Sequence, residues 1–246
     1  MLAEFAFRQG DNALVLGHRL SEWCGMGPAL EEDIALANTA LDLIGQGKLW
    51  LELAAEEVGQ TADELAFLRD AHAYRCALLV ELPNGDFGQT LLREFFFDAF
   101  QLPWLRALTA SSSARVAEIA AKSAKEAAYH LERSAETVIA LGDGTEASNA
   151  RMASALAYLW PYTGELLVDG GEDEACAEAG VAPLPSSMRG EWDRVVTDVL
   201  AQAMLTRPED SFAQKGGRTG ARHTEHLGHL LATMQALPRA HPGASW

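Results

Sequence analysis

Two segments of the sequence have the spacing of a metal-binding pair but lack most of its ligands. A glutamate and a histidine three residues apart lie on one face of a helix, so two such helices can enclose two metal ions. In the first segment these positions are Leu43 and Gln46. In the second they are Ala127 and His130, so both glutamates and one histidine are missing. The pattern indicates a helical bundle that has kept a metal-binding fold and lost the metal chemistry.

Three histidines near the C-terminal end form a second candidate metal site. His223, His226 and His229 follow one another at three-residue intervals, and Glu225 precedes His229 by four residues. On one helix these side chains would share a broad face and could bind a metal ion such as zinc. The alternative is a helix that packs its polar face against the rest of the protein or a partner, and we favour that alternative.

Composition excludes several classes of function. The 246-residue chain carries a net charge of −16, whereas nucleic-acid binding needs clustered lysine and arginine. No apolar run approaches the ~20 residues needed to cross a bilayer, and the first residues lack the pattern of a signal peptide. The three cysteines are scattered without CxxC spacing, as expected of free thiols in the cytoplasm. We therefore expect a cytoplasmic protein that binds neither nucleic acid nor membrane.

Apolar residues recur at the helical period along most of the chain, and strand patterns are scarce. With 48% hydrophobic residues the chain can bury a full core, so an all-α protein is expected. Capping residues, glycines and prolines divide it into segments. The acidic segment at 169–187 is predicted to be exposed and to hold at most one short helix. The predicted helices run over about 11–23, 29–58, 61–81, 87–110, 114–141, 145–160, 188–205 and 222–237.

Four of these helices match a ferritin-like four-helix bundle, in which two helical pairs are joined by a crossover. The bundle would consist of the helices at 11–23, 29–58, 87–110 and 114–141, and the helix at 61–81 would be the crossover. We predict a single ferritin-like domain over 1–246, with the core bundle at about 11–141 and a C-terminal helical extension at about 145–246.

Several motifs together resemble a known family. They are Leu16–Trp23 (LGHRLSEW), Glu31–Leu36 (EEDIAL), Leu41–Gln46 (LDLIGQ), Pro83–Phe87 (PNGDF), Leu141–Glu146 (LGDGTE) and His223–Gly228 (HTEHLG). These motifs closely resemble the non-catalytic structural subunits of bacterial phenylacetyl-CoA epoxidases, and the resemblance extends over nearly the whole chain. Members of this family have a ferritin-like fold and pair with a related catalytic subunit that holds a di-iron centre.

The resemblance implies which positions correspond to the metal ligands of the catalytic subunit. The retained ligands are matched by Glu22, Asp98 and His130. The lost ligands correspond to Leu43, Gln46 and Ala127, and the losses at 43 and 127 remove both bridging carboxylates. Leucine and alanine offer no donor atom, and glutamine offers a weak neutral one. We therefore predict no catalytic, cofactor-binding or metal-binding residue in this chain, and a di-iron centre in its partner.

The three retained residues leave two alternatives. Glu22, Asp98 and His130 could form a mononuclear site that resembles the facial triad of iron oxygenases. Otherwise they hydrogen-bond one another, together with Gln46, inside the bundle, because buried carboxylates need such partners. We favour the hydrogen-bonded arrangement.

The resemblance implies a structural, non-catalytic subunit in aerobic phenylacetate catabolism, with no activity of its own. The assembled complex would epoxidise the aromatic ring of phenylacetyl-CoA with oxygen, using electrons from a separate reductase. Two alternatives remain: a metal-dependent oxygenase with the mononuclear site, and a stand-alone acyl-CoA-binding bundle that forms a homodimer. In the complex, phenylacetyl-CoA could lie at the cleft between subunits, where the basic loop Lys215–Gly220 is one candidate for contacting its phosphates.

Overall fold

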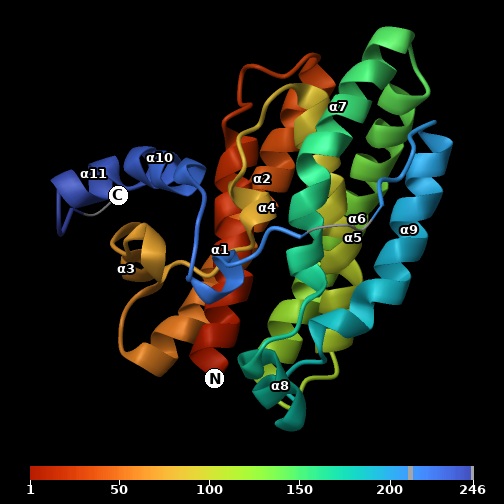
Figure 1. The fold of residues 1–246 in the computed structure, drawn as a ribbon. Coiled ribbons are helices and arrows are strands. Elements are labelled where there is room, and N and C mark those ends of the chain that lie inside the picture. The colour runs from red at the N-terminus through yellow and green to blue at the C-terminus, as the bar shows by residue number, and fades with distance from the viewer. Residues whose placement is uncertain (210–212, 245–246) are drawn as a thin grey trace. The chain divides into compact units, whose positions relative to one another are not determined.

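The computed structural model describes residues 1–209 and 213–244, and within these residues the chain forms helices and connecting loops without a strand (Figure 1). The predicted all-α class is confirmed, and the helices are consistent with a ferritin-like bundle. The chain divides into two compact units. Unit one consists of Met1–Pro83 and Lys215–Trp246, and unit two of Asn84–Gln214. That the whole chain forms one ferritin-like domain stays a prediction.

Two long helices form the centre of unit one. The helices α1 (Leu2–Ser21) and α2 (Leu30–Val58) lie side by side (Figure 1). Their backbones approach closely at Gly47, where a Cβ atom would lie 3.1 Å from the backbone nitrogen of Leu14. The prediction for α2 is confirmed, whereas α1 begins nine residues before the predicted start at Asp11. The apolar N-terminal turns add to the core, because Phe5 packs edge-on against the buried Trp50 with ring centres 5.9 Å apart.

The segment predicted as one crossover helix at 61–81 is instead broken into three short pieces. These are α3 (Ala62–Phe67), the 3-10 turn η1 (Ala71–Ala73) and α4 (Leu78–Glu81). The predicted capping box is confirmed, since Thr61 Oγ1 accepts from the Glu64 backbone at 3.1 Å and Glu64 Oε2 accepts from the Thr61 backbone at 2.8 Å. Beyond the end of α3, the buried carboxylate of Asp11 pairs with Arg69 and accepts from the backbone N–H of Arg75 at 2.7 Å, so this segment is held to α1.

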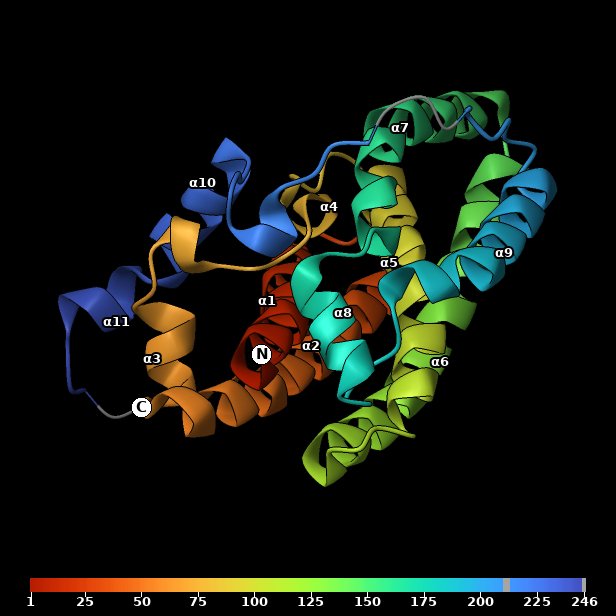
Figure 2. The ribbon, with the colours of Figure 1, turned by 60° about the horizontal axis from the view of Figure 1, so that its bottom comes forward.

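The C-terminal tail of unit one lies beside α3 (Figure 2). It contains the 3-10 turn η4 (Gly217–Thr219) and the helices α10 (Glu225–Met234) and α11 (Ala236–Ala240). The single helix predicted at 222–237 thus begins later and is divided at Gln235. The side chain of Gln235 is buried and donates to the backbone oxygen of Arg69 at 2.9 Å, which holds the tail at this point.

The described residues of unit two form five helices and two 3-10 turns. They are α5 (Phe87–Leu108), α6 (Ala114–Gly142), α7 (Glu146–Thr163), η2 (Gly164–Leu167), α8 (Gly171–Glu178), η3 (Pro185–Met188) and α9 (Arg189–Gln202). The predicted ends are close to these, except that α7 continues through Pro161, where the prediction ended it. Aromatic side chains from three helices pack together in this unit. Phe96 of α5, Trp160 of α7 and Trp192 of α9 form a buried group, and Trp192 Nε1 donates a hydrogen bond to the backbone oxygen of Phe96 at 3.1 Å.

No helix among the described residues combines the length and the apolar character that a membrane span requires.

The close approach of α1 and α2 can be tested by one substitution at two glycines of α2. Gly47→Val should lower the free energy of unfolding by about 1–3 kcal/mol, because the added carbons push against the backbone of α1. Gly45→Val is the matched control, since a Cβ atom there has open space around it. Urea unfolding of both variants checks the prediction. Equal destabilisation by the two variants would contradict the close packing.

Candidate functional site

Glu22, one of the three retained ligand-like residues, does not lie in the interior. It is the C-cap of α1, and its side chain is 42% exposed. The carboxylate accepts a hydrogen bond from Arg19 Nη1 at 2.9 Å. The expectation that Glu22 is buried is therefore not met, and its grouping with Asp98 and His130 stays a prediction. A glutamate one turn from an arginine is paired locally, and that pairing does not require the bundle interior.

Leu43 and Gln46 stand on α2 at the positions of the first lost pair. Both side chains are buried, each about 1% exposed. The leucine contributes only hydrocarbon, and the amide of Gln46 is neutral. These two positions in unit one offer no anionic ligand.

Asp98 on α5 and His130 on α6 are the retained residues of unit two, and both are buried. Asp98 Oδ2 accepts a hydrogen bond from Ser134 Oγ at 2.8 Å. Burial, and then the negative charge of Glu94, raise the pKa of Asp98 well above its ordinary range, although Ser134 and Arg133 act in the opposite direction. The environment of Asp98 therefore favours a protonated, neutral carboxyl group.

The six ligand-like positions do not fit a di-iron centre. Leu43 and Ala127 are buried without donor atoms, so nothing replaces the two bridging carboxylates. Glu22 is paired with Arg19, on an exposed side chain. The residues present do not supply the ligand set of a di-iron centre, and the absence of a mononuclear site stays a prediction.

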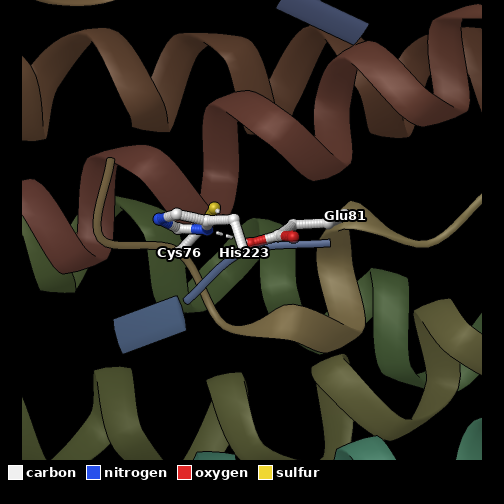
Figure 3. Close-up of side chains that lie close together, drawn as sticks. All are labelled: Cys76, Glu81 and His223. Atoms are coloured by element: carbon white, nitrogen blue, oxygen red, sulfur yellow. Dashed lines mark hydrogen bonds and ion pairs between the residues drawn. The ribbon is translucent and has the colours of Figure 1, made fainter. Parts of the chain in front are cut away.

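A different group of side chains comes together in unit one. Cys76, Glu81 and His223 place a sulfur, an oxygen and a nitrogen within 4.8 Å of one another, and among the described residues this is the one such group (Figure 3). Glu81 is the last residue of α4, and His223 lies two residues before α10. The group therefore joins the tail to the segment that follows α3.

The carboxylate of Glu81 is fully buried and accepts hydrogen bonds on both oxygens. His223 Nδ1 donates to Oε1, and Cys76 Sγ donates to the same atom at 3.6 Å. The backbone nitrogen and the hydroxyl of Thr224 both donate to Oε2 at 2.8 Å. Thr224 is the N-cap of α10, so a buried negative charge lies at the N-terminal end of that helix, where it is favourable.

The geometry around His223 favours its charged form. Its Nε2 lies 3.2 Å from the backbone oxygen of Tyr74, so an acceptor faces each ring nitrogen. An imidazole can donate from both nitrogens only when it is protonated. Burial alone would lower the pKa of His223, but the hydrogen bond and charge of Glu81 outweigh burial and raise it above its ordinary value.

Arg19 extends this group to α1. Its Nη2 donates to the backbone oxygen of Glu81 at 2.8 Å and to that of His226 at 2.9 Å. We call Arg19, Glu22, Glu81, His223 and Thr224 the tail clasp. The donor atoms of Cys76, Glu81 and His223 are of the types that zinc accepts, and the same atoms are within hydrogen-bonding distance of one another.

The predicted arrangement of the tail histidines is wrong. His223 lies before α10, whereas His226 and His229 lie within it, so the three do not share a helical face. His229 is exposed, whereas His223 forms a hydrogen bond with the carboxylate of Glu81. The three-residue spacing does not place them on one helical face, because Thr224 is the N-cap of α10 and has an extended backbone, so His223 lies outside the helix.

Known proteins resemble this chain over its full length. The family described as "Phenylacetic acid catabolic protein" matches residues 1–246. The chain belongs to this family. It is also similar to an Escherichia coli (strain K12) protein whose name describes a subunit of 1,2-phenylacetyl-CoA epoxidase, with 43% identity over 246 residues, which is 100% of this chain and 99% of the relative. The resemblance inferred from the motifs is thus confirmed for the family.

Sequence reasoning missed Glu81, Cys76 and the role of Arg19 in this member of the family. One signal was present: Glu81 is the one charged residue in the apolar run from Cys76 to Leu82. A lone carboxylate in such a run predicts a buried partner. The sequence could not name that partner, because His223 is 142 residues away along the chain.

Removing the charge of Glu81 should destabilise the protein. Glu81→Gln leaves His223 and the capping donors of Thr224 without their anionic acceptor, and breaking such a buried pair costs about 3–5 kcal/mol. Urea unfolding measures the loss. Glu57→Gln, at an exposed glutamate of α2, is the matched control and should change little. A similar effect of both substitutions would rule out the tail clasp as a stabilising element.

The tail clasp should also weaken at alkaline pH. Because the folded state raises the pKa of His223, the stabilisation from its charged form is full below the unfolded pKa of about 6.5. It is lost as the pH rises through the higher folded-state pKa. The difference in unfolding free energy between the wild type and His223→Gln should therefore narrow from acidic to alkaline pH. A difference that stays constant with pH would show that His223 is neutral in the folded protein.

Proposed function

We propose that this chain is the structural, non-catalytic subunit of a multicomponent phenylacetyl-CoA 1,2-epoxidase. The observation that carries the proposal is the full-length match to a protein named as a subunit of that enzyme. The match covers 99% of the relative, so both units and the tail have counterparts there. In this proposal the complex adds one oxygen atom to the aromatic ring of phenylacetyl-CoA, and a separate reductase supplies electrons.

The donor atoms of the chain support a non-catalytic role. Epoxidation by such a complex needs a metal centre that activates oxygen, and the buried side chains of Leu43 and Ala127 cannot bridge two irons. The di-iron centre is therefore assigned to a catalytic partner subunit. This chain would stabilise the fold and the position of the helices that hold the partner's metal.

The tail clasp and the packed helices suit this role. A supporting subunit must present a fixed surface, because misplacing a catalytic group by about 1 Å can cost two orders of magnitude in rate. In unit one, Arg19 donates to backbone oxygens of α4 and α10, and the Glu81 carboxylate accepts from the backbone nitrogen of Thr224. These contacts hold α1, α4 and the start of α10 together. Such a network rigidifies a surface without taking part in chemistry.

Co-expression with the catalytic partner tests the proposal. The two chains should co-elute on gel filtration, iron should follow the partner, and this chain alone should hold no stoichiometric iron and turn over no phenylacetyl-CoA. Stoichiometric iron in the isolated chain, or no complex, would contradict it.

A substitution at a ligand-like position sharpens the test. Asp98→Asn should change the epoxidation rate of the complex by no more than about twofold, because an amide resembles the neutral carboxyl that the site favours. The control replaces a ligand histidine of the partner's di-iron centre, which should abolish turnover. Equal loss in both complexes would show that Asp98 takes part in catalysis.

A further inference from the structure

The group of Cys76, Glu81 and His223 brings a thiol, a carboxylate and an imidazole to one point in unit one (Figure 3). Sulfur, oxygen and nitrogen of these side chains are the three kinds of atom that bind zinc in proteins. The cysteine is decisive, because a soft thiolate favours zinc over magnesium or calcium. None of the three residues belongs to the six ligand-like positions, so a site here is separate from the lost di-iron centre.

The cysteine and glutamate atoms are already spaced like two ligands of one zinc ion. Cys76 Sγ lies 3.6 Å from Glu81 Oε1. Zinc–sulfur and zinc–oxygen bonds of about 2.3 and 2.0 Å at a tetrahedral angle place two such atoms about 3.5 Å apart. His223 Nδ1 lies closer to Oε1 in its hydrogen bond, so the imidazole has to move outward to admit the ion. Its side chain is 8% exposed and stands in the loop before α10, whereas the other two are fully buried, so the imidazole is the ligand that moves.

The second ring nitrogen of His223 is held as in a metal-binding histidine. Nε2 lies 3.2 Å from the backbone oxygen of Tyr74. A histidine that binds a metal through one nitrogen almost always donates from the other to a carbonyl or carboxylate oxygen, which fixes its tautomer and orientation. When Nε2 carries the proton donated to Tyr74, the neutral imidazole presents the lone pair of Nδ1 toward Glu81.

Glu81 is held by outer hydrogen bonds in the same way. Its Oε2 accepts from the backbone nitrogen and the hydroxyl of Thr224, both at 2.8 Å. Its Oε1 is the oxygen that faces Cys76 and His223. Carboxylates that bind metal ions usually have such outer partners. One oxygen is therefore satisfied by the protein, and the other is directed at the two remaining donors.

Replacing protons by zinc conserves the charge of this buried group. With Cys76 as a thiol, Glu81 ionised and His223 protonated, the charges sum to zero. A zinc ion with a thiolate, a carboxylate and a neutral imidazole also sums to zero, and one proton from sulfur and one from Nδ1 pass to the solvent. Because an uncompensated charge is costly in a buried site, this balance favours the exchange.

We propose that Cys76 Sγ, Glu81 Oε1 and His223 Nδ1 bind one zinc ion, with a water molecule as the fourth tetrahedral ligand. Cys76 precedes α4, Glu81 ends it and His223 lies in the tail, so the ion fastens the tail to α4. Its role is to stabilise unit one and not to catalyse a reaction. The inference goes beyond the proposed function and does not rest on it, and it assigns metal ligands where the sequence predicted none.

Zinc binding to the full-length chain, first freed of metal with EDTA, tests the inference. After dialysis against zinc sulfate and then buffer, the wild type should hold one zinc ion per chain by elemental analysis. At a hundredfold excess of zinc over its Kd, the thermal midpoint should rise by about 5–10 °C. Cys76→Ser should weaken zinc binding by about a hundredfold or more in calorimetry, because even the loss of an outer partner costs about ten- to a hundredfold. Serine can still donate to Glu81, and unchanged circular dichroism without zinc would show that the variant folds.

Cys176→Ser is the matched control, since Cys176 is a buried cysteine of unit two, and it should bind zinc as the wild type does. Cobalt(II) in place of zinc reports the ligand directly, because a thiolate bound to cobalt gives a charge-transfer band in the near ultraviolet. The band should appear in the wild type and in Cys176→Ser and be absent from Cys76→Ser.

Two results would overturn the inference. One is a wild-type chain that binds no zinc. The other is equal zinc binding by the wild type and Cys76→Ser, which would place the ion at other residues, such as the exposed His229. Both results leave the proposed function standing, because that function is tested by co-elution with the catalytic partner.

Discussion

The buried carboxylate of Glu81 is the interaction on which unit one depends. A charge with no solvent contact is tolerated only when hydrogen bonds replace its water, and here His223, Cys76 and Thr224 supply them. Its backbone oxygen in turn accepts from the buried guanidinium of Arg19. One residue thus connects α1, α4 and the N-terminal end of α10, which are far apart in the sequence.

The same network gives one of the ligand-like residues a partner within the protein. Glu22 matches a terminal carboxylate of di-iron proteins, but in this chain it pairs with Arg19 of the tail clasp. Asp98 survives in another way, since burial favours its neutral form and Ser134 satisfies one of its oxygens. Retained residue types are therefore weak evidence for retained chemistry. The buried hydrocarbon at Leu43 and Ala127 is stronger evidence, because no rearrangement of a side chain can supply the lost donors.

Predictions from local pattern succeeded where the stabilising interactions are local. Both ends of the long helix α2 were predicted to within one residue. Its acidic first turn and its apolar period depend only on residues that are close together in the sequence. The capping box at Thr61 was found for the same reason. The prediction failed a few residues later, where the helix ends at Phe67 and the following segment is held by Asp11, which lies 64 residues before Arg75 and accepts its backbone N–H. It failed again at His223, whose position follows from Glu81 rather than from its neighbours.

The sequence by itself determined the all-α class and most helix positions, since each depends on the identity or period of nearby residues. Its motifs also identified the family. Only the tertiary structure decided that Glu22 is exposed, that the segment after Thr61 is broken, and that Glu81 holds the tail. It also showed that Leu30, Ile34 and Leu41 are exposed, whereas their period alone predicts a buried face. Burial and long-range pairing depend on which segments come into contact in the folded protein. No local sequence pattern specifies contacts between residues that are far apart in the chain.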